Sequence, residues 1–304
     1  MTARLLDGRD LASHLRRDLL HRVERLTDGD PDAAPRLAIL RSGESNAAAL
    51  YAASLERAAR SVGVEPLVLT DETATLLGRM DALNADPRIA GIVVAQPLGD
   101  PGHGRRLVEA IDPAKDVDGA TPTNAGWLAR GEPAFVPATA LAVIAILEAY
   151  EVPIGGRRAV IVGRSAVVGR PVASLLVARD ATVVICHRAT RNLARETRRA
   201  EILVAAAGSP GLIQPLMVNR SAVIVDCGIN AVAAGIVGDV EFATVAPVVS
   251  AISPVPGGIG PVTPMMVLRQ LVESAERASP RTSGAIISSS ETDPSMNPSR
   301  SIVS

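Results

Sequence analysis

Lysine is almost missing from this chain of 304 residues, in which Lys115 is the only lysine among 31 basic residues. Arginine therefore supplies nearly every positive charge, and a position without lysine has to be judged by the residue that stands there instead. The net charge is -1, and no basic excess points to nucleic acid or to an anionic membrane as a partner. With 47% hydrophobic residues, the composition also argues against disorder.

Cysteine, histidine and long apolar runs are scarce as well. Cys186 and Cys227 both lie inside apolar runs, which indicates buried free thiols in a reducing compartment. The four histidines show no ligand spacing with one another or with the cysteines, so we expect no metal site. We find no signal peptide and no run long enough to span a bilayer, and expect a cytoplasmic protein with no membrane partner.

Short β-branched runs alternate with helical patterns along the chain. Near-continuous apolar strands separated by helices predict a parallel sheet that is covered on both faces. In the first half we expect strands at 36–40, 66–70 and 91–95, with helices at about 47–61 and 74–84. A helix near 139–150 leads into strands at 158–163, 181–187, 201–208 and 222–228, and a last helix covers about 264–277.

The predicted fold class is α/β, with two α/β domains of which the second is a Rossmann-like dinucleotide-binding domain. Residues 1–140 together with 264–278 form the first domain, and residues 141–263 form the second. The tail, residues 279–304, is rich in Ser, Pro and Thr without a sustained pattern, and we expect it to be disordered.

A strand, a glycine-bearing turn, a helix and a second strand follow one another over residues 158–188. Gly163 and Gly169 bracket the turn at an interval that departs from the usual G-x-G-x-x-G. The surrounding βαβ pattern strengthens the assignment, because amides at the start of the helix can face a pyrophosphate. An α/β turn without a ligand stays open as the alternative.

The end of the second strand bears on which dinucleotide is bound. NAD-binding folds usually place an acid there to accept hydrogen bonds from the ribose hydroxyls. Here the residues are Cys186, His187 and Arg188, with Arg164 available from the glycine turn. Two arginines and no acid favour the 2′-phosphate of NADP over NAD.

Three segments together resemble the bifunctional methylenetetrahydrofolate dehydrogenase/methenyltetrahydrofolate cyclohydrolase family. They are "VGRSAVVGRPVASLL" (162–176), "SPVPGGIGPVTPMM" (253–266) and "DPAKDVDGATPTNAGWLARG" (112–131), and the likeness runs from about residue 4 to 278. The resemblance implies a homodimer joined through the cofactor domains, with a folate-type substrate in the cleft between a catalytic first domain and the NADP-binding second domain. It also implies oxidation of 5,10-methylenetetrahydrofolate by NADP, followed by hydrolysis of the methenyl product to 10-formyltetrahydrofolate.

The resemblance also assigns roles by position. Asp118 grips the pterin ring and Tyr51 stacks on the folate, and both are expected to be catalytic; on their own they would read as a turn residue and as core packing. Leu55, Gln96, Pro256 and Gly257 complete the expected substrate site. On the cofactor side the expected residues are Gly163, Arg164, Ser165 and Gly169 at the phosphates, His187 and Arg188 beside the adenosine ribose, and Cys227, Ile229, Gly260 and Thr263 by the nicotinamide.

Two positions depart from the family in a concerted way. Where the family has a catalytic lysine four residues after the tyrosine, this chain has Leu55, which neither carries charge nor forms hydrogen bonds; the family's next lysine has become Arg57. The glutamine that bonds the catalytic lysine has become Ala95, with Gln96 one residue later and turned to the opposite face. The P-C-T-P-x-G motif of the family also differs here, at residues 137–142.

Hydride transfer needs no base, whereas hydrolysis of the methenyl cation needs a group that manages protons. We therefore predict an NADP-dependent methylenetetrahydrofolate dehydrogenase with cyclohydrolase activity lost or weak. Two alternatives stay open: an enzyme of this fold recruited to another amine or iminium substrate in a specialised pathway, and a catalytically silent folate- or nucleotide-binding protein.

Overall fold

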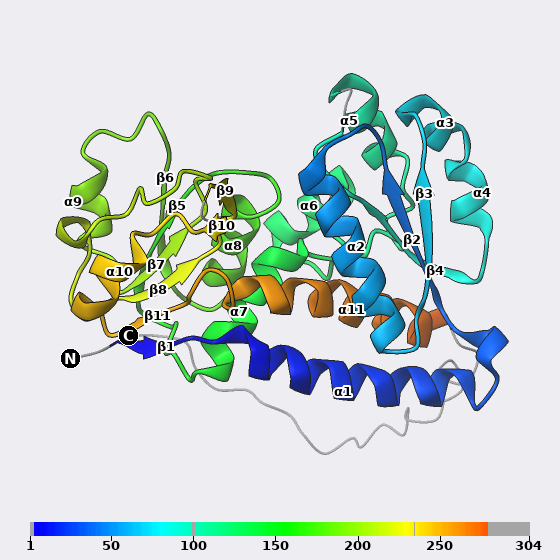
Figure 1. Ribbon diagram of the computed structural model, residues 1–304, viewed down its shortest axis with the longest axis horizontal. Helices are drawn as coiled ribbons and strands as arrows, with labels where there is room; N and C mark the ends of the chain where they lie inside the picture. The colour runs from blue at the N-terminus through cyan, green and yellow to red at the C-terminus, as the bar shows by residue number, and fades with distance from the viewer. Residues whose placement is uncertain (1–2, 99–100, 234, 279–304) are drawn as a thin grey trace, which may run out of the picture.

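Two parallel sheets lie side by side in the computed structural model, which describes residues 3–98, 101–233 and 235–278 (Figure 1). The smaller sheet has the strand order β3-β2-β4, and the larger has the order β1-β11-β8-β7-β5-β6. Every pairing within these sheets is parallel, as the sequence predicted for an α/β fold. The strands are β1 (Arg4–Leu5), β2 (Arg36–Arg41), β3 (Glu65–Thr70), β4 (Ile89–Val94), β5 (Arg158–Val162), β6 (Thr182–Cys186), β7 (Ile202–Ala205), β8 (Val223–Asp226) and β11 (Ala251–Ile252).

In the first half of the chain, the helix expected at about 47–61 is present at Asn46–Ser61, whereas the helices at Gly8–Thr27, Pro101–Glu109 and Pro122–Arg130 were not predicted. The single helix expected at about 74–84 is two helices that break at Gly78 and Arg79, because glycine is a poor helix former and the chain changes direction there. The helices are α1 (Gly8–Thr27), α2 (Asn46–Ser61), α3 (Thr73–Gly78), α4 (Met80–Ala85), α5 (Pro101–Glu109) and α6 (Pro122–Arg130).

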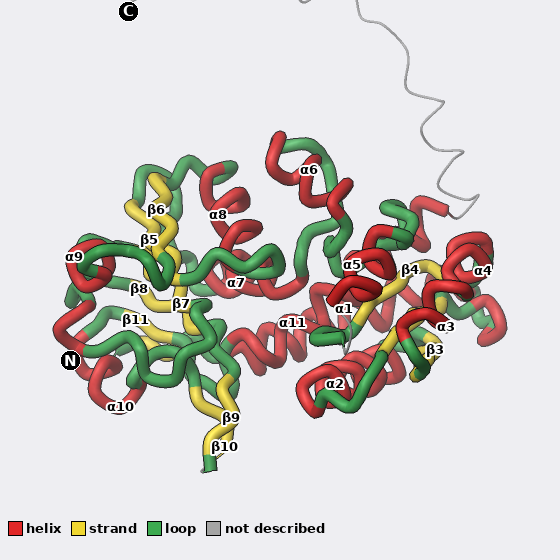
Figure 2. The backbone as a smooth tube through the Cα atoms, turned by 90° about the horizontal axis from the view of Figure 1, so that it is seen from above, coloured by secondary structure: helices red, strands yellow, loops and turns green. Residues whose placement is uncertain are grey.

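The second half adds α7 (Ala138–Ala149), α8 (Gly169–Val177), α9 (Leu193–Thr197), α10 (Phe242–Val245) and α11 (Ile259–Ala278), with short 3₁₀ helices at Pro31–Ala33, Pro215–Met217 and Ala246–Val248. An antiparallel hairpin, β9 (Asn230–Val232) and β10 (Gly235–Val237), extends from the body (Figure 2). The last helix begins at Ile259, earlier than the expected start at 264, so Pro264 lies inside it. The helix tolerates this proline near its start, in the second turn.

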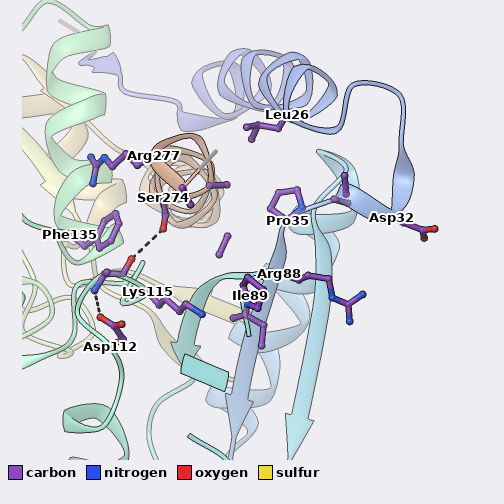
Figure 3. Close-up of a pocket in the computed structure, with 17 residues that line it drawn as sticks. Leu26, Asp32, Pro35, Arg88, Ile89, Asp112, Lys115, Phe135, Ser274 and Arg277 are labelled. Atoms are coloured by element: carbon purple, nitrogen blue, oxygen red, sulfur yellow. Dashed lines mark hydrogen bonds between the residues drawn. The ribbon is translucent and has the colours of Figure 1, made fainter. Parts of the chain in front are cut away.

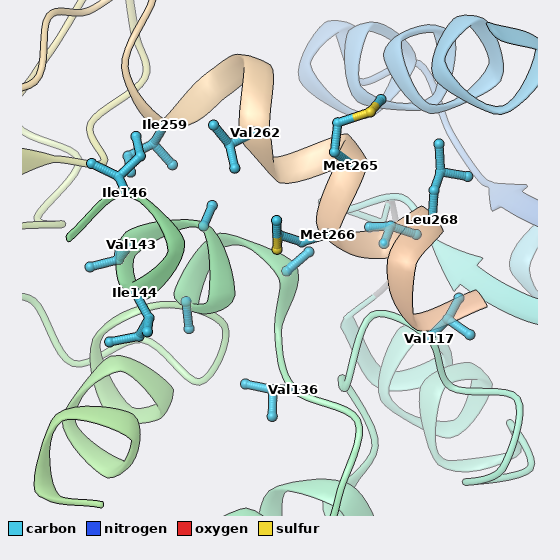
Figure 4. Close-up of a cluster of buried hydrophobic side chains, with 14 of the residues drawn as sticks. Val117, Val136, Val143, Ile144, Ile146, Ile259, Val262, Met265, Met266 and Leu268 are labelled. Carbon is cyan, nitrogen blue, oxygen red and sulfur yellow. The ribbon is translucent and has the colours of Figure 1, made fainter. Parts of the chain in front are cut away.

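One hydrophobic core connects the two sheets through α7 and α11 (Figure 4). Val143 and Ile146 of α7 and Met266 of α11 belong to the same buried cluster as Ile39 of the small sheet and Ile161 of the large one. The segments that follow the strand ends are thereby fixed relative to each other. The predicted disordered tail, residues 279–304, lies outside the described residues, and no helix within the described part is both long and apolar enough to cross a bilayer.

Candidate active site

The structure brings Tyr51 and Asp118 together, although they are far apart in the sequence. Tyr51 lies on α2, and its hydroxyl donates to Oδ2 of Asp118 at 3.4 Å. The backbone amide of Ala138, the first residue of α7, donates to Oδ1 of the same carboxylate, also at 3.4 Å. Both Tyr51 and Asp118 remain partly exposed, so the pair can be reached from outside.

A buried network holds the loop that carries Asp118. Asp116 is fully buried and accepts hydrogen bonds from the amides of Ala120 and Thr121 and from Nδ2 of Asn124. Gln270 of α11 donates to the carbonyl oxygens of Val117 and Val136 and accepts from the amide of Val136. The sequence analysis did not find these supporting residues.

Burial dominates the electrostatics at this carboxylate. It raises the pKa of Asp118 from 3.8 to about 7, and the negative charge of Asp116 acts in the same direction, against the opposing hydrogen bonds from Ala138 and Tyr51. The pKa of the Tyr51 phenol is raised by burial and by Asp118. No arginine or lysine of the described chain comes within 4.0 Å of the Asp118 carboxylate to form an ion pair.

Leu55 and Ala95, the two positions at which we expect a departure from the family, lie in the apolar core. Leu55, one helical turn after Tyr51, is 0% exposed, and Ala95, just after β4, is also 0% exposed. Both belong to the cluster that joins the two sheets. Gln96 is exposed instead and lines a separate hollow of about 450 Å³ with Leu98 and Arg105. Gln96 is thus exposed, whereas Leu55 and Ala95 are buried, and the hollow that Gln96 lines does not include Leu55.

The two glycines that bracket the turn after β5 leave no room for a side chain at their positions. A Cβ atom on Gly163 would lie 2.0 Å from the Ala206 carbonyl oxygen, and one on Gly169 would lie 2.2 Å from the Gly163 carbonyl oxygen. The Ser165 hydroxyl accepts the amide of Val168, the residue just before α8, at 3.1 Å. The turn therefore presents backbone at the position where a dinucleotide phosphate is expected.

Arginines surround this turn without acidic partners. Arg164 and Arg170 are both exposed at the start of α8, where a positive charge opposes the helix dipole unless an anion is bound nearby. Arg170 was not among the residues expected from the sequence, although it follows Gly169 directly. At the end of β6, Arg188 and Arg191 are exposed in the segment "CHRATRN", which contains no acid.

The His187 backbone is ordered by its neighbours. Its amide donates to the Thr190 hydroxyl at 2.8 Å, and its Nδ1 accepts the amide of Ala189 at 3.2 Å, which leaves the proton on Nε2. Four arginines and a turn bracketed by two glycines fit a phosphorylated dinucleotide, and the 2′-phosphate of NADP in particular.

The expected nicotinamide side is built from the ends of β8 and α11. Cys227 was expected to be buried but is half-buried, because the chain leaves the sheet there. Cys186 is buried as expected, and both thiols are free. Ile229 is 73% exposed. Gly260 is exposed in the first turn of α11, with open space where a Cβ would lie, and the Thr263 hydroxyl donates to the Ile259 carbonyl at 3.3 Å.

Pro256 and Gly257, expected at the substrate, precede α11. Pro256 is exposed after a cis peptide bond, and Gly257 is buried with a φ of 118°, in the region that favours glycine. The Gly257 carbonyl accepts the amide of Gly8, which fixes this loop to the start of α1. A Cβ on Gly257 would lie 2.7 Å from the Arg9 guanidinium.

Comparison with known proteins decides which family has this arrangement. Residues 6–118 match the family model described as tetrahydrofolate dehydrogenase/cyclohydrolase, catalytic domain, and residues 137–279 match the NAD(P)-binding domain of the same family. The chain belongs to the tetrahydrofolate dehydrogenase/cyclohydrolase family. It is 46% identical over 275 residues to the bifunctional protein FolD of Parafrankia sp., a match that covers 90% of this chain and 99% of the relative. The FolD protein of Bordetella petrii is 44% identical over 282 residues, covering 90% and 95%.

Solved structures agree with this assignment. The bifunctional FolD enzyme of Campylobacter jejuni superposes with a TM-score of 0.86 at 37% identity, covering 91% of this chain and 100% of that one. The Trypanosoma brucei dehydrogenase-cyclohydrolase, complexed with NADP and an inhibitor, gives 0.86 at 32% identity, covering 91% and 99%. The predicted family, the two-domain fold, the enzymatic nature and the NADP cofactor are thereby confirmed, whereas the individual site residues and the domain boundaries stay predictions.

Within a tetrahydrofolate dehydrogenase/cyclohydrolase, the position of the single lysine matters. Lys115 donates through Nζ to the carbonyl oxygens of Leu83 at 3.3 Å and Asp86 at 2.7 Å. It lines a hollow of about 590 Å³ next to Pro35 and Ile89, where β2 and β4 begin, while Ala95 follows the other end of β4 (Figure 3). Arg57 is exposed on the outside of α2. Neither cation lies beside Leu55 in the core.

Two buried acids organise the loops of the NAD(P)-binding domain. The Asp239 carboxylate accepts the amides of Ala207, Gly208 and Ser209 after β7 and the side-chain amide of Asn230. Asp226 accepts the amides of Gly228, Asp239 and Val240. Burial is the main cause that raises the pKa of Asp226 from 3.8 to about 6. These acids, which the sequence analysis missed, fasten the hairpin to the ends of β7 and β8.

Proposed function

We propose that this protein oxidises 5,10-methylenetetrahydrofolate to 5,10-methenyltetrahydrofolate with NADP and does not carry out the hydrolysis that follows in its bifunctional relatives. One observation supports this most strongly. Leu55 and Ala95, at the positions of the family's lysine and glutamine, are apolar and completely buried.

The residues around the cleft suit the oxidation. The Asp118 carboxylate accepts the adjacent N–H donors of the pterin, and the Tyr51 ring stacks on the folate. Arg164 and Arg188 bind the phosphates, and bound NADP supplies the hydride acceptor. The methylene carbon loses a hydride to give the methenyl cation and NADPH, so no proton has to be removed. Positioning of the two reactants is what this step requires.

Hydrolysis of the cation requires groups that this cleft lacks. Water must lose a proton as it adds, and the ring nitrogen must gain one as the ring opens. The Tyr51 phenol has a raised pKa and stays protonated, while Asp118 is engaged by the pterin. Leu55 and Ala95 offer neither donor nor acceptor.

A second candidate is an enzyme of this fold recruited to another amine or iminium substrate. The observation that favours it is the changed segment at residues 137–142, where Ala138, Ala140 and Ala142 are all buried beside the site. A catalytically silent folate- or nucleotide-binding protein is the third reading. Both predict no turnover of methylenetetrahydrofolate.

The test is to mix the protein with 5,10-methylenetetrahydrofolate and NADP and to follow the absorbance of the methenyl product and of NADPH. A stable methenyl signal supports the proposal, and absence of turnover with both NADP and NAD refutes it. In the double variant Leu55→Lys/Ala95→Gln we expect hydrolysis of added methenyltetrahydrofolate to reappear. The matched control Leu55→Met/Ala95→Ser has no cation and should behave as the wild type does.

We further propose that the protein is a homodimer joined through its cofactor domains. The apolar side chains of the projecting hairpin support this, since Val232 is 39% and Ile236 46% exposed (Figure 2). Light scattering coupled to size-exclusion chromatography measures the mass of the particle. A dimer that becomes monomeric in Val232→Asp/Ile236→Asp is the expected result, and a wild-type monomer contradicts it.

A further inference from the structure

No cation of the described residues contacts the Asp118 carboxylate, which is about half ionised at neutral pH and fully ionised above its pKa of about 7. Asp116 lies two residues away in the same loop, and its hydrogen-bond donors are neutral amides. The groups that contact Asp118 itself, the Tyr51 hydroxyl and the Ala138 amide, are neutral as well. Hydrogen bonds from neutral donors spread the charge of a carboxylate but do not cancel it.

The basic residues that lie nearest along the chain are committed elsewhere. Lys115 is bound to carbonyl groups at the far end of β4, and Arg57 points to solvent. Arg9, which lies against Gly257, forms an ion pair with Asp7 at 2.8 Å. In the family pattern a lysine one turn after Tyr51 would supply the missing positive charge, and this chain has Leu55 there.

We propose that this site prefers the cationic methenyl form of its ligand to the neutral methylene form, and that Leu55 is the residue that sets this preference. The inference rests on the proposed function. The two ligands differ by one hydride, so their contacts with Tyr51 and the pterin-binding loop are the same. Their difference in charge remains, and an unbalanced carboxylate in a site of low dielectric attracts the cation. A lysine at position 55 would repel the cation and offset Asp118.

The same arrangement shields the bound cation from water. Leu55 and Ala95 are buried in the core, and neither side chain can donate a proton to the ligand or accept one from it. The product therefore leaves intact, and the reaction that consumes it is a hydrolysis or a reduction catalysed by another enzyme.

The experiment follows the decay of methenyltetrahydrofolate at neutral pH, by its absorbance, with the protein in excess and without NADP. Calorimetric titration with methylenetetrahydrofolate, also without NADP, first establishes that the folate site is intact and gives the affinity for the neutral form. We expect the wild type to slow the decay at least tenfold and to bind the methenyl form at least tenfold more tightly. Asp118→Asn should reduce the ratio of the two affinities at least tenfold.

Variants at position 55 separate charge from packing. Leu55→Gln adds hydrogen-bonding capacity without charge and should keep the preference, whereas Leu55→Lys should abolish it. Circular dichroism checks that each variant folds, and if Leu55→Lys does not, the comparison of Asp118→Asn with Leu55→Gln carries the test.

The outcomes distinguish this inference from the function on which it rests. Saturable binding of methylenetetrahydrofolate together with decay at the free rate overturns the cation preference and leaves the dehydrogenase proposal intact. An unchanged affinity ratio in Asp118→Asn overturns it too. Decay faster than that of the free compound, or no binding of either folate, overturns both proposals.

Discussion

Asp118 is the residue whose removal should affect the folate substrate most. Asp118→Asn keeps the shape of the side chain but loses the charge, and hydrogen bonds to charged groups contribute about 1.5–3 kcal/mol. We expect the KM for methylenetetrahydrofolate to rise about 10- to 100-fold while the KM for NADP stays the same. Asp112→Asn, an exposed acid at the start of the same segment, is the matched control. An unchanged folate KM in Asp118→Asn would remove this residue from the site.

The pH dependence of stability follows from the same carboxylate. Asp118 has a pKa of about 7 in the folded protein and 3.8 as its ordinary value, so between these values the folded state holds more protons than the unfolded state. The free energy of unfolding should therefore fall as the pH rises from about 4 to 7. Asp226, raised to about 6, acts in the same direction.

Urea unfolding at a series of pH values checks this slope. The lowered pKa values of Glu65, Glu201 and Glu276 act with the opposite sign, but only below the ordinary value of 4.5, so they do not enter the window from pH 5 to 7. In Asp118→Asn, the free energy of unfolding should fall less steeply as the pH rises through this window. A wild type and variant with the same pH profile would show that Asp118 does not titrate in this window.

The sequence analysis found the two central residues of the site but missed the residues that hold the neighbouring loops in place. Tyr51 and Asp118 were expected to share one site, and the structure brings their side chains within hydrogen-bonding distance. Gln270 and Asp239 were not expected, because each acts by bonding backbone groups of segments remote in the sequence. A polar residue within an amphipathic helix or hairpin gives no sign of which loop it will reach.

At the scale of elements, the length of a strand decided whether the sequence could predict it. Strands of five or six residues such as β2 and β5 show an apolar run that stands out, whereas β1 and β11 have two residues each and gave no pattern. These two strands pair with each other, and β11 pairs with β8. Their place depends on the tertiary fold, since a two-residue strand has no stability of its own.

The hairpin β9–β10 gives a prediction at this scale, because Asp239 fastens it to the loop after β7. Asp239→Ala leaves the amides of Ala207, Gly208 and Ser209 without their acceptor, and the loop at the cofactor should lose its order. We expect the KM for NADP to rise at least about tenfold, with calorimetric folate affinity unchanged. Thr244→Ala, exposed on α10, serves as the control. An equal weakening of NADP binding and of folate binding would indicate general unfolding instead of a local effect.

At the scale of the whole molecule, the two sheets behave as one structure in this arrangement. The core cluster that contains Leu55 and Ala95 continues through α7 and α11 into the large sheet. Leucine and alanine at these two positions therefore contribute to the core that both sheets share. The double variant Leu55→Lys/Ala95→Gln places a charge in that core and should therefore be less stable than the wild type.

This shared core predicts that the two sheets unfold together. Met266 of α11 is 0% exposed in the shared cluster, and Met266→Ala should lower the free energy of unfolding by about 2–5 kcal/mol. Trp127, the only tryptophan, reports from α6, which packs against α8, while far-UV circular dichroism reports on all elements. We expect the two signals to give one urea midpoint in the wild type and one lower midpoint in the variant. Val177→Ala, 59% exposed on α8, should leave the midpoint in place. Two separate transitions, of which Met266→Ala shifts one alone, would show instead that each sheet has a core of its own.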